Sequence, residues 1–260
     1  MKGAPVLVKI GGTAAEKKSA IASLAAEISS LSAEHRFLIV HGGGAEVTAL
    51  SKRLGIESVF VRGLRQTSEA EMDVVEMVLS GKVNKALVRS LRMCGLNAVG
   101  VSGTDGGIIS GFSIGNLPDG ARSRTGEVSG ADGRLVSLLL DNGYLPVVSP
   151  PAMDAEGLAL NINADTAAFS LAVALSCSAL VFLSDIPGII SDGTVIHELT
   201  TAEARALCAR GVITGGMLPK VTASVDAIGR GVETVIIGQY EEQGSLSALL
   251  EGKKGTRIWK

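Results

Sequence analysis

Short apolar runs rich in β-branched residues alternate along this chain with longer stretches of helical periodicity, and this alternation constrains the fold more than any other feature. Val6–Ile10 and Phe37–Val40 have the composition of buried strands, whereas Glu16–Ser32 and Ala45–Leu54 have the spacing of helices. Strands that alternate with helices are typical of a parallel sheet covered by helices. We therefore predict an α/β fold.

The same pattern continues through the rest of the chain. Further helices are predicted at Ser68–Cys94, Leu135–Asn142, Ala164–Leu175, Thr201–Arg210 and Leu218–Gly229. Further strands are predicted at Asn97–Val101, Leu145–Val148, Ala179–Leu183 and Thr234–Ile237. Gly103–Gly133 is rich in Gly, Ser and Asp, which predicts hairpins or loops. The pattern indicates one continuous sheet with two functional halves, divided near Pro150–Ala159.

Composition narrows the class of protein. In 260 residues, 46% are apolar and 19% charged, which is enough to bury a large core. The formal charge of -2 leaves no basic surface of the kind that binds a polynucleotide, so we expect no nucleic-acid partner. No apolar run approaches the roughly 18 residues of a membrane span, and the first residues lack the apolar core of a signal peptide. We expect a cytoplasmic protein whose three cysteines are reduced packing residues.

Two predicted strands end in glycine-rich turns. Lys9 precedes Gly11 and Gly12, which puts a cation beside backbone that an anion can approach closely. The second strand ends in His41 and three glycines that lead directly into a helix, so N–H groups point outward from the carboxyl end of the sheet. Neither turn fits the dinucleotide or P-loop pattern. Both turns predict an anion site, although each could also be an ordinary tight turn.

Polar residues elsewhere fit the same kind of site. Arg65 lies just before the long predicted helix, where its guanidinium could grip a carboxylate through two hydrogen bonds, or could lie on a surface loop. Asn161, Asn163 and Asp165 alternate on one face of an extended segment, and Asn163 or Asp165 could instead cap the following helix. Lys220 lies in the first turn of a helix, where it opposes the helix dipole unless an anion sits beside it.

Six motifs occur in this order along nearly the whole chain: KIGG at Lys9, HGGG at His41, GLRxT at Arg65, NINAD at Asn161, LSDxxG at Ser184 and GGMxxK at Lys220. Through these six ordered motifs the chain resembles the amino acid kinase superfamily, and within it the acetylglutamate kinases. The resemblance implies an open, mainly parallel eight-stranded sheet sandwiched between helices. It also implies a single kinase domain over residues 1–260, with an acceptor-binding half (1–155) and an ATP-binding half (156–260).

The resemblance further implies roles for individual residues. Lys9 and Lys220 would stabilise charge on the transferring phosphoryl group, and Asp165 would orient the two lysines. Gly43, Gly44, Arg65 and Asn161 would hold the acceptor. The nucleotide site would be formed by Gly11, Gly12, Ser184, Asp185, Ile186, Pro187, Gly188, Val212, Ile213, Thr214, Met217 and Lys220.

The implied reaction is phosphorylation of the side-chain carboxylate of N-acetyl-L-glutamate by ATP, an early step of arginine biosynthesis. A carboxylate needs no general base, so catalysis depends on alignment and on neutralisation of charge. Mg²⁺ would be held mainly by the ATP phosphates and water, since the sequence offers no carboxylate cluster for a protein metal site.

Three alternatives remain open from the sequence. Thr104 stands where many relatives carry Lys, and its surroundings resemble the aminoadipate or glutamate kinases of lysine or arginine biosynthesis that act on a carrier-protein-linked substrate. The near-neutral charge favours the free acceptor, because docking of an acidic carrier requires a basic surface. A catalytically silent amino-acid sensor would not need Lys9, Asp165 and Lys220 together, and a dehydrogenase would need a GxGxxG turn.

The resemblance also suggests how the chain assembles. Arginine-inhibited relatives carry an additional N-terminal helix, whereas only Met1–Pro5 precede the first predicted strand here, fewer residues than two helical turns. Closed two-fold dimers are the commonest assembly of soluble enzymes. The expectation is a homodimer whose activity changes little with L-arginine.

Overall fold

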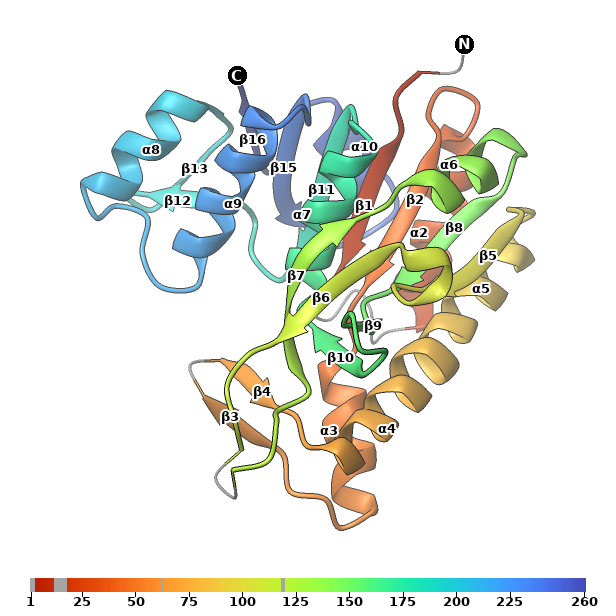
Figure 1. Cartoon of the computed structure of the whole chain (residues 1–260). Helices are drawn as coiled ribbons and strands as arrows, with labels where there is room; N and C mark the ends of the chain where they lie inside the picture. The colour runs from red at the N-terminus through yellow and green to blue at the C-terminus, as the bar shows by residue number, and fades with distance from the viewer. Residues whose placement is uncertain (1–2, 12–17, 62, 118–119) are drawn as a thin grey trace.

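The computed structural model describes residues 3–11, 18–61, 63–117 and 120–260. Its centre is an eight-stranded sheet in the order β14-β16-β15-β11-β1-β2-β8-β5 (Figure 1). The strands of this sheet are β1 Val6–Ile10, β2 Phe37–His41, β5 Ala98–Ser102, β8 Leu145–Ser149, β11 Ala179–Ser184, β14 Glu198–Thr200, β15 Thr234–Gln239 and β16 Thr256–Trp259. All pairs are parallel except β15 with β16. The predicted α/β class with a mostly parallel sheet is confirmed.

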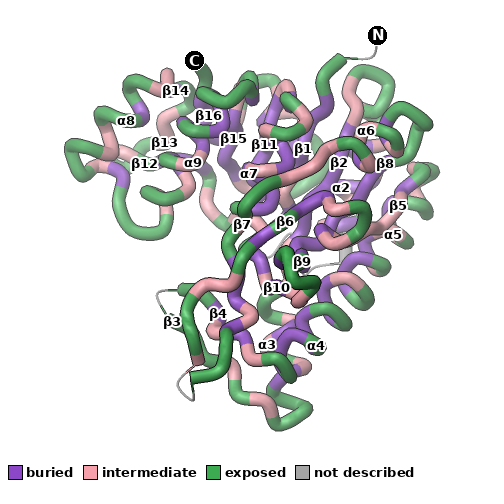
Figure 2. Tube along the Cα trace, in the orientation of Figure 1, coloured by how far each residue is buried: buried purple, intermediate pink, exposed green. Residues whose placement is uncertain are grey.

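The two faces of the sheet bury separate apolar cores. Along β1, Val6, Val8 and Ile10 belong to one core and Leu7 to the other, as the two-residue period of a strand requires. Because Lys9 alternates with these residues, it shares the face of Leu7. Figure 2 shows the inner strands of the sheet, such as β1, β2 and β11, buried along most of their length.

Helices cover each face. The core of Val6 and Val8 is covered by α2 Lys18–Leu31, α3 Gly44–Arg53, α4 Glu69–Glu76, α5 Asn84–Met93 and α10 Ser245–Leu250. The core of Leu7 is covered by α6 Arg134–Asp141, α7 Ala164–Ala174, α8 Thr201–Ala209 and α9 Met217–Gly229. Within the described residues, no helix is both long and apolar enough to cross a membrane.

A small closed barrel lies against the second face. It consists of β6 Ile109–Ser113, β7 Thr125–Ala131, β9 Ala152–Met153 and β10 Ala159–Ile162, with the short 3₁₀ turn η2 Asp105–Gly107 before it. The strands pack closely, because a Cβ at Gly111 or Gly126 would come within about 3 Å of Leu160 and Ile162. β10 pairs with β7 and β9 although it follows the expected division of the chain at residue 155.

Two short hairpins complete the fold. β3 Val59–Val61 pairs with β4 Leu64–Gln66, and β12 Ile189–Ser191 pairs with β13 Thr194–Ile196. Figure 1 shows the β3–β4 hairpin and α3 beyond the carboxyl ends of β1 and β2.

The long helix predicted at Ser68–Cys94 is present as one continuous helical run, but its middle part is π-helical. α4 is capped by the Ser68 hydroxyl, which accepts from the Glu71 N–H, and is followed by a π-helical segment, η1 Met77–Val83, before α5 begins. Gly81 lies inside this segment, where its low helical propensity weakens the regular α-helix. π-Helical turns inside helices are frequent near functional sites.

The other predicted boundaries agree with the structure to within about two residues, and the predicted hairpin region contains β6 and β7. Part of the predicted helix Glu16–Ser32 lies outside the described residues. The sequence did not predict the β3–β4 and β12–β13 hairpins, β9, β14, α10 or β16. These elements are two to six residues long, too short for periodicity in the sequence to identify them, and β3 is exposed throughout.

Candidate active site

Three neighbouring turns lie at the carboxyl edge of the central sheet. The register of β1 places Ile10 beside both Leu183 and His41. The N–H of Gly11 donates to the Leu183 carbonyl at 3.2 Å, and the N–H of Gly42 donates to the Ile10 carbonyl at 3.2 Å. Ligands of open α/β sheets bind outside the carboxyl ends of the strands. This edge is therefore the place for a ligand site.

Lys9, Asp165 and Lys220 meet at this edge. Lys9 Nζ lies 2.6 Å from Asp165 Oδ1, and Lys220 Nζ lies 3.2 Å from Asp165 Oδ2. The three side chains retain 13%, 29% and 16% of their exposure, so a ligand can reach them. The structure thus brings together the three predicted catalytic residues from three separate elements.

The cluster carries a surplus of positive charge. Burial acts most strongly on Asp165 and would raise its pKa, but the charges of Lys9 and Lys220 and their contacts with the carboxylate outweigh it and hold that pKa below its usual value. One carboxylate therefore faces two ammonium groups. The excess positive charge suits an anion with several negative oxygens, such as a phosphoryl group.

Lys9 reaches this position because Gly11, the first residue after β1, carries no side chain. A Cβ at Gly11 would collide with Lys9 Nζ, so a larger residue there would displace the ammonium group from its present place over the turn. The Gly11 N–H is already used in the sheet, as described above. Gly11 therefore contributes space rather than a hydrogen bond.

Asp165 and Lys220 come from the first turns of α7 and α9. The side-chain oxygen of Asn163 accepts from the N–H groups of Asp165, at 2.8 Å, and Thr166, at 3.4 Å, so Asn163 is the cap of α7. The Asp165 side chain is thereby left to pair with the lysines. Lys220 opposes the dipole of α9, and the carboxylate of Asp165 compensates this charge.

A pocket of about 210 Å³ adjoins the cluster. Gly43, Gly44, Arg65 and Asn161 line it together with Ala164, the neighbour of Asp165 in sequence. The structure therefore brings together the four residues predicted to hold the acceptor. We call this cavity the acceptor pocket.

Gly43 turns the chain from β2 into α3. It has φ +147°, a conformation that favours glycine, and a Cβ there would lie 2.8 Å from the Leu79 side chain. Within the described residues, no protein acceptor is recorded for the N–H of Gly43 or Gly44. Both N–H groups are therefore available to an anion at the N-terminus of α3.

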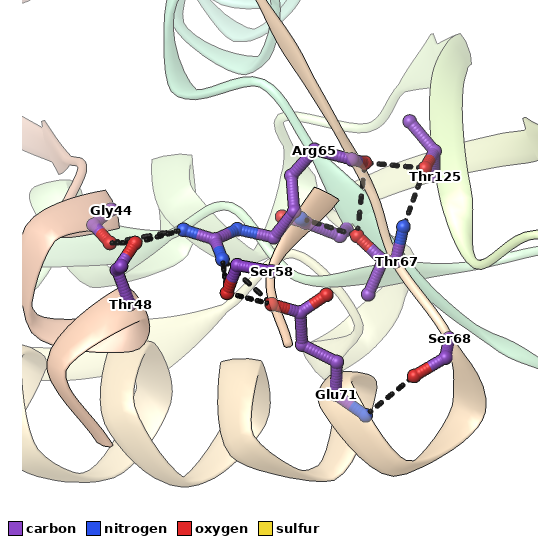
Figure 3. A network of polar contacts seen from close by, with 9 residues as sticks. Gly44, Thr48, Ser58, Arg65, Thr67, Ser68, Glu71 and Thr125 are labelled. Atoms are coloured by element: carbon purple, nitrogen blue, oxygen red, sulfur yellow. Dashed lines mark hydrogen bonds and ion pairs between the residues drawn. The ribbon is translucent and has the colours of Figure 1, made fainter. Parts of the chain in front are cut away.

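Arg65 is held by a buried network (Figure 3). Its Nη1 donates to Glu71 Oε1 at 2.7 Å and to Ser58 Oγ at 2.6 Å. Its Nη2 donates to Thr48 Oγ1 at 2.7 Å and to the Gly44 carbonyl at 3.1 Å. The network thus connects the β3–β4 hairpin with α3 and α4.

This network differs from the arrangement expected at Arg65. A guanidinium has four terminal N–H donors, and all four already have protein acceptors. Two hydrogen bonds from Arg65 to a substrate carboxylate would therefore require one of these protein acceptors to move. Among the described residues, the Nε–H is the one guanidinium donor of Arg65 without a protein acceptor. The reason is Glu71, whose side chain is 1% exposed and neutralises Arg65 inside the protein.

Asn161 belongs to the same wall of the pocket. Its Nδ2 donates to Thr67 Oγ1 at 2.9 Å, and Thr67 Oγ1 donates in turn to the Arg65 carbonyl at 3.2 Å. Thr125 Oγ1 donates to this carbonyl as well, at 2.6 Å. Figure 3 shows Thr67 and Thr125 beside the backbone of Arg65. Asn161 therefore supports the strand that carries Arg65.

The predicted nucleotide residues Ser184–Gly188, at the end of β11, form a bend beside β1, the strand that carries Lys9. Ser184 Oγ accepts from the Ile186 N–H at 3.3 Å, whereas Asp185 and Pro187 are exposed. Gly188 has φ +155° and is packed closely against Thr256. The bend presents polar groups at the same edge as Lys9.

The second predicted nucleotide segment leads into α9. Thr214 is exposed, Val212 and Met217 are half-buried, and Ile213 is only 3% exposed. The Ile213 side chain therefore packs in the core and could meet a nucleotide only through its backbone. Gly12 was also predicted to bind nucleotide and lies outside the described residues.

Within the described residues, no group of three or more His, Cys, Asp or Glu side chains could hold a metal ion. Asp165 lies at the site but is already paired with two lysines.

Sequence reasoning missed three residues of the site: Glu71, Phe182 and Asn84. Glu71 is paired with Arg65, Phe182 lies under Lys220, and Asn84 contacts His41. Glu69 and Glu71 lie in the same predicted helical turn, so their spacing in the sequence does not indicate which of them is buried. Asn84 lies close to Lys82 and Lys85 in the sequence, so its surroundings there do not distinguish it from an exposed helical residue.

Comparison with known proteins identifies relatives along nearly the whole chain. The profile of the amino acid kinase family matches residues 4–239. The chain is 44% identical over 237 residues to the acetylglutamate kinase of Geobacillus kaustophilus, covering 90% of each chain. It is 41% identical over 263 residues to that of Acaryochloris marina, covering 98% of this chain and 92% of the relative.

Solved structures share the fold. N-acetylglutamate synthase from Neisseria gonorrhoeae, in complex with coenzyme A and N-acetyl-glutamate, superposes with a TM-score of 0.84 at 26% identity, over 100% of this chain and 60% of that one. Carbamate kinase from Giardia lamblia bound to AMP-PNP superposes with a TM-score of 0.74 at 19% identity, covering 99% of each chain, which shows the fold alone. With a family profile over most of its length and relatives above 40% identity, this chain belongs to the amino acid kinase family.

Proposed function

We propose that this chain transfers the γ-phosphoryl group of ATP to the side-chain carboxylate of N-acetyl-L-glutamate. The product is N-acetylglutamyl 5-phosphate, an acyl phosphate, and the reaction is an early step of arginine biosynthesis. The relatives named acetylglutamate kinase support this acceptor over one linked to a carrier protein.

The observation that carries the proposal is the pairing of Lys9 and Lys220 with the single carboxylate of Asp165 beside the acceptor pocket. Phosphoryl transfer to a carboxylate needs no general base, and its main requirement is neutralisation of charge on the phosphoryl oxygens. Two ammonium groups held by one carboxylate supply that charge in a fixed position. Asp165 thus acts as the group that orients both lysines.

The acceptor pocket supplies alignment. Gly43 and Gly44 offer N–H groups to an anion, and Arg65 and Asn161 line the same pocket. Holding the carboxylate in line with the phosphoryl group makes the reaction effectively unimolecular, which accounts for a large share of the rate in such enzymes.

ATP is proposed to bind beside the bend at Ser184–Gly188 and the segment before α9. Mg²⁺ would enter with the nucleotide and would be held mainly by phosphate oxygens and water, because Asp165 is engaged with two lysines. The ion would neutralise phosphate charge, and the residues of this chain would align the two reactants.

A division of labour along the chain follows from this arrangement. We propose a single kinase domain in which residues 1–155 contribute most of the acceptor site and residues 156–260 most of the ATP site. Asn161 is an exception, because β10 pairs with the barrel of the first half. We also propose that the protein is a cytoplasmic homodimer, the commonest assembly of soluble enzymes.

The test is a hydroxylamine trap of the acyl phosphate. The protein is incubated with MgATP and, in parallel, N-acetyl-L-glutamate, N-acetyl-L-aspartate, L-glutamate and N-acetyl-L-aminoadipate, with a carrier-linked acceptor as a fifth arm. The proposal expects the highest kcat/KM with free N-acetyl-L-glutamate. Preferential turnover of the carrier-linked acceptor would overturn the choice of substrate.

A further inference from the structure

His41 is fully buried at the end of β2 and makes two hydrogen-bonding contacts. Its Nδ1 lies 2.8 Å from the Gly42 carbonyl, and its Nε2 lies 3.1 Å from the Asn84 Nδ2. A carbonyl can only accept, so Nδ1 carries the proton and donates to Gly42. Nε2 is then unprotonated and accepts from Asn84.

The orientation of the Asn84 amide supports this tautomer. Nδ2 also donates to the Val147 carbonyl at 2.9 Å, and Oδ1 accepts from Lys85 Nζ at 2.9 Å. The amide group is therefore fixed with its NH₂ toward His41. A Cβ at Gly100 would overlap Oδ1, so the glycine in β5 leaves space for this amide.

Burial, reinforced by the charge of Lys85, lowers the pKa of His41 to about 4, although the contact with Gly42 works in the opposite direction. The imidazole is thus neutral at physiological pH and is suited to hold a group in place rather than to exchange protons.

The Gly42 carbonyl is the point where this pair meets the acceptor pocket. Gly42 and Gly43 line the pocket, and the peptide bond between them is planar. In a trans peptide the C=O and the following N–H point in opposite directions. A carbonyl directed at buried His41 therefore directs the Gly43 N–H away from His41, toward the open side of the turn.

The π-helical segment η1 supports the same turn from behind. The side chains of Leu79 and Val83 lie where a Cβ at Gly43 would come within 2.8 Å and 3.2 Å of them. Asn84 directly follows this segment. The turn is thus held by packing against η1 and by the hydrogen bond from His41.

We propose that His41 and Asn84 are positioning residues: Asn84 fixes the imidazole tautomer, and His41 holds the Gly42 carbonyl so that the Gly43 N–H faces the acceptor's anionic group. The inference rests on the proposed function for the identity of the acceptor. The hydrogen bonds from Asn84 to His41 and from His41 to Gly42 can be tested without an assay of kinase activity.

The first measurement is ¹⁵N NMR of the imidazole groups. The chain has three histidines, so the His41→Asn variant assigns the His41 signals by difference. The proposal expects a neutral His41 protonated at Nδ1. A neutral ring protonated at Nε2 overturns it, whether or not the protein phosphorylates N-acetyl-L-glutamate.

The second measurement compares kinetics of His41→Leu and His41→Asn. Leucine removes the donor to Gly42, whereas the amide of asparagine can place an N–H near the position of Nδ1. We expect kcat/KM for N-acetyl-L-glutamate to fall by about 10- to 100-fold in His41→Leu and by less than about fivefold in His41→Asn. The KM for ATP should change by less than about twofold in both.

His197→Leu is the matched control, because His197 Nδ1 also contacts a carbonyl, that of Gly255, outside the acceptor pocket. It should leave acceptor kinetics unchanged. A folded His41→Leu protein with wild-type acceptor kinetics overturns the proposal. If that variant does not fold, the NMR tautomer decides. Absence of kinase activity in the wild-type protein would instead reject the proposed function and leave the tautomer result standing.

Discussion

The ring of Phe182 lies beneath the ammonium group of Lys220, with Nζ 5.0 Å from the ring centroid. Phe182 is fully buried in β11, and its register partner in β1 is Lys9. The ring therefore supports one lysine from below and neighbours the strand of the other. The attraction between a cation and an aromatic face is worth roughly 0.5–2 kcal/mol, with the larger values where the pair is shielded from water.

Replacement of Phe182 by Leu should lower kcat by about 3- to 30-fold, because Lys220 loses its aromatic support while the core stays apolar. Phe169→Leu is the control: Phe169 packs on Phe182 with ring centroids 4.7 Å apart but does not lie under Lys220. The measurement is steady-state kinetics with thermal unfolding of both variants. Equal losses of kcat in the two variants would show that only packing is involved.

Glu71→Gln should destabilise the protein by about 3–5 kcal/mol, because the buried charge of Arg65 loses its partner. Glu69→Gln should cost at most about 1 kcal/mol, since its pair with Arg124 leaves Glu69 82% exposed. Chemical unfolding of both variants in urea measures the difference. If the free energy of unfolding fell by similar amounts in Glu71→Gln and Glu69→Gln, the Arg65–Glu71 pair would not stabilise the fold.

Arg65→Lys should raise KM for the acceptor by about 5- to 150-fold, equivalent to roughly 1–3 kcal/mol, and leave KM for ATP nearly constant. A lysine cannot reproduce the three contacts, with Gly44, Thr48 and Glu71, that tie the β3–β4 hairpin to α3 and α4. Initial-rate kinetics with each substrate varied in turn test this. The reverse pattern, a raised KM for ATP alone, would move Arg65 to the nucleotide site.

Glu69 and Glu71 also illustrate how far sequence reasoning extends. Both occupy the first turn of α4, yet one is solvated and the other is buried against Arg65. Periodicity identified the helix, but the partner comes from a hairpin whose strands are too short and too exposed to predict. For this reason the sequence did not reveal that the terminal N–H groups of Arg65 already have protein acceptors.

Residues at strand ends were more predictable. Parallel strands bring their carboxyl ends to one edge, so glycine turns after β1 and β2 indicated a shared site. The mismatch of Lys220 with the dipole of α9 indicated an anion nearby, and Asp165 is that anion. The sequence left open whether Asn163 or Asp165 caps α7, because either side chain can cap a helix and only the fold brings the lysines to one of them.

The pKa of Asp165 gives a pH test of the cluster. Its pKa is below the usual 3.8, so the stabilisation that it contributes is fully present above about pH 4 and is lost as pH falls through the folded-state value. Side-chain ¹³C NMR should show Asp165 titrating below 3.8 in the wild-type protein. In Lys220→Met the pKa should rise, because one of two attracting charges is removed. A pKa that does not change in this variant would mean that Lys220 and Asp165 do not interact in solution.

The most direct test of the site is the rate of phosphoryl transfer in Lys9→Ala and Lys220→Ala, measured in single turnovers with MgATP and N-acetyl-L-glutamate both saturating. Each lysine is positioned to act on charge that develops during transfer, so the rate should fall by at least about 10²-fold while the Kd for ATP changes far less. Thermal unfolding of each variant confirms that it is folded. A folded variant of either lysine with the wild-type rate of transfer would contradict the assignment of Lys9, Asp165 and Lys220 as the transfer centre.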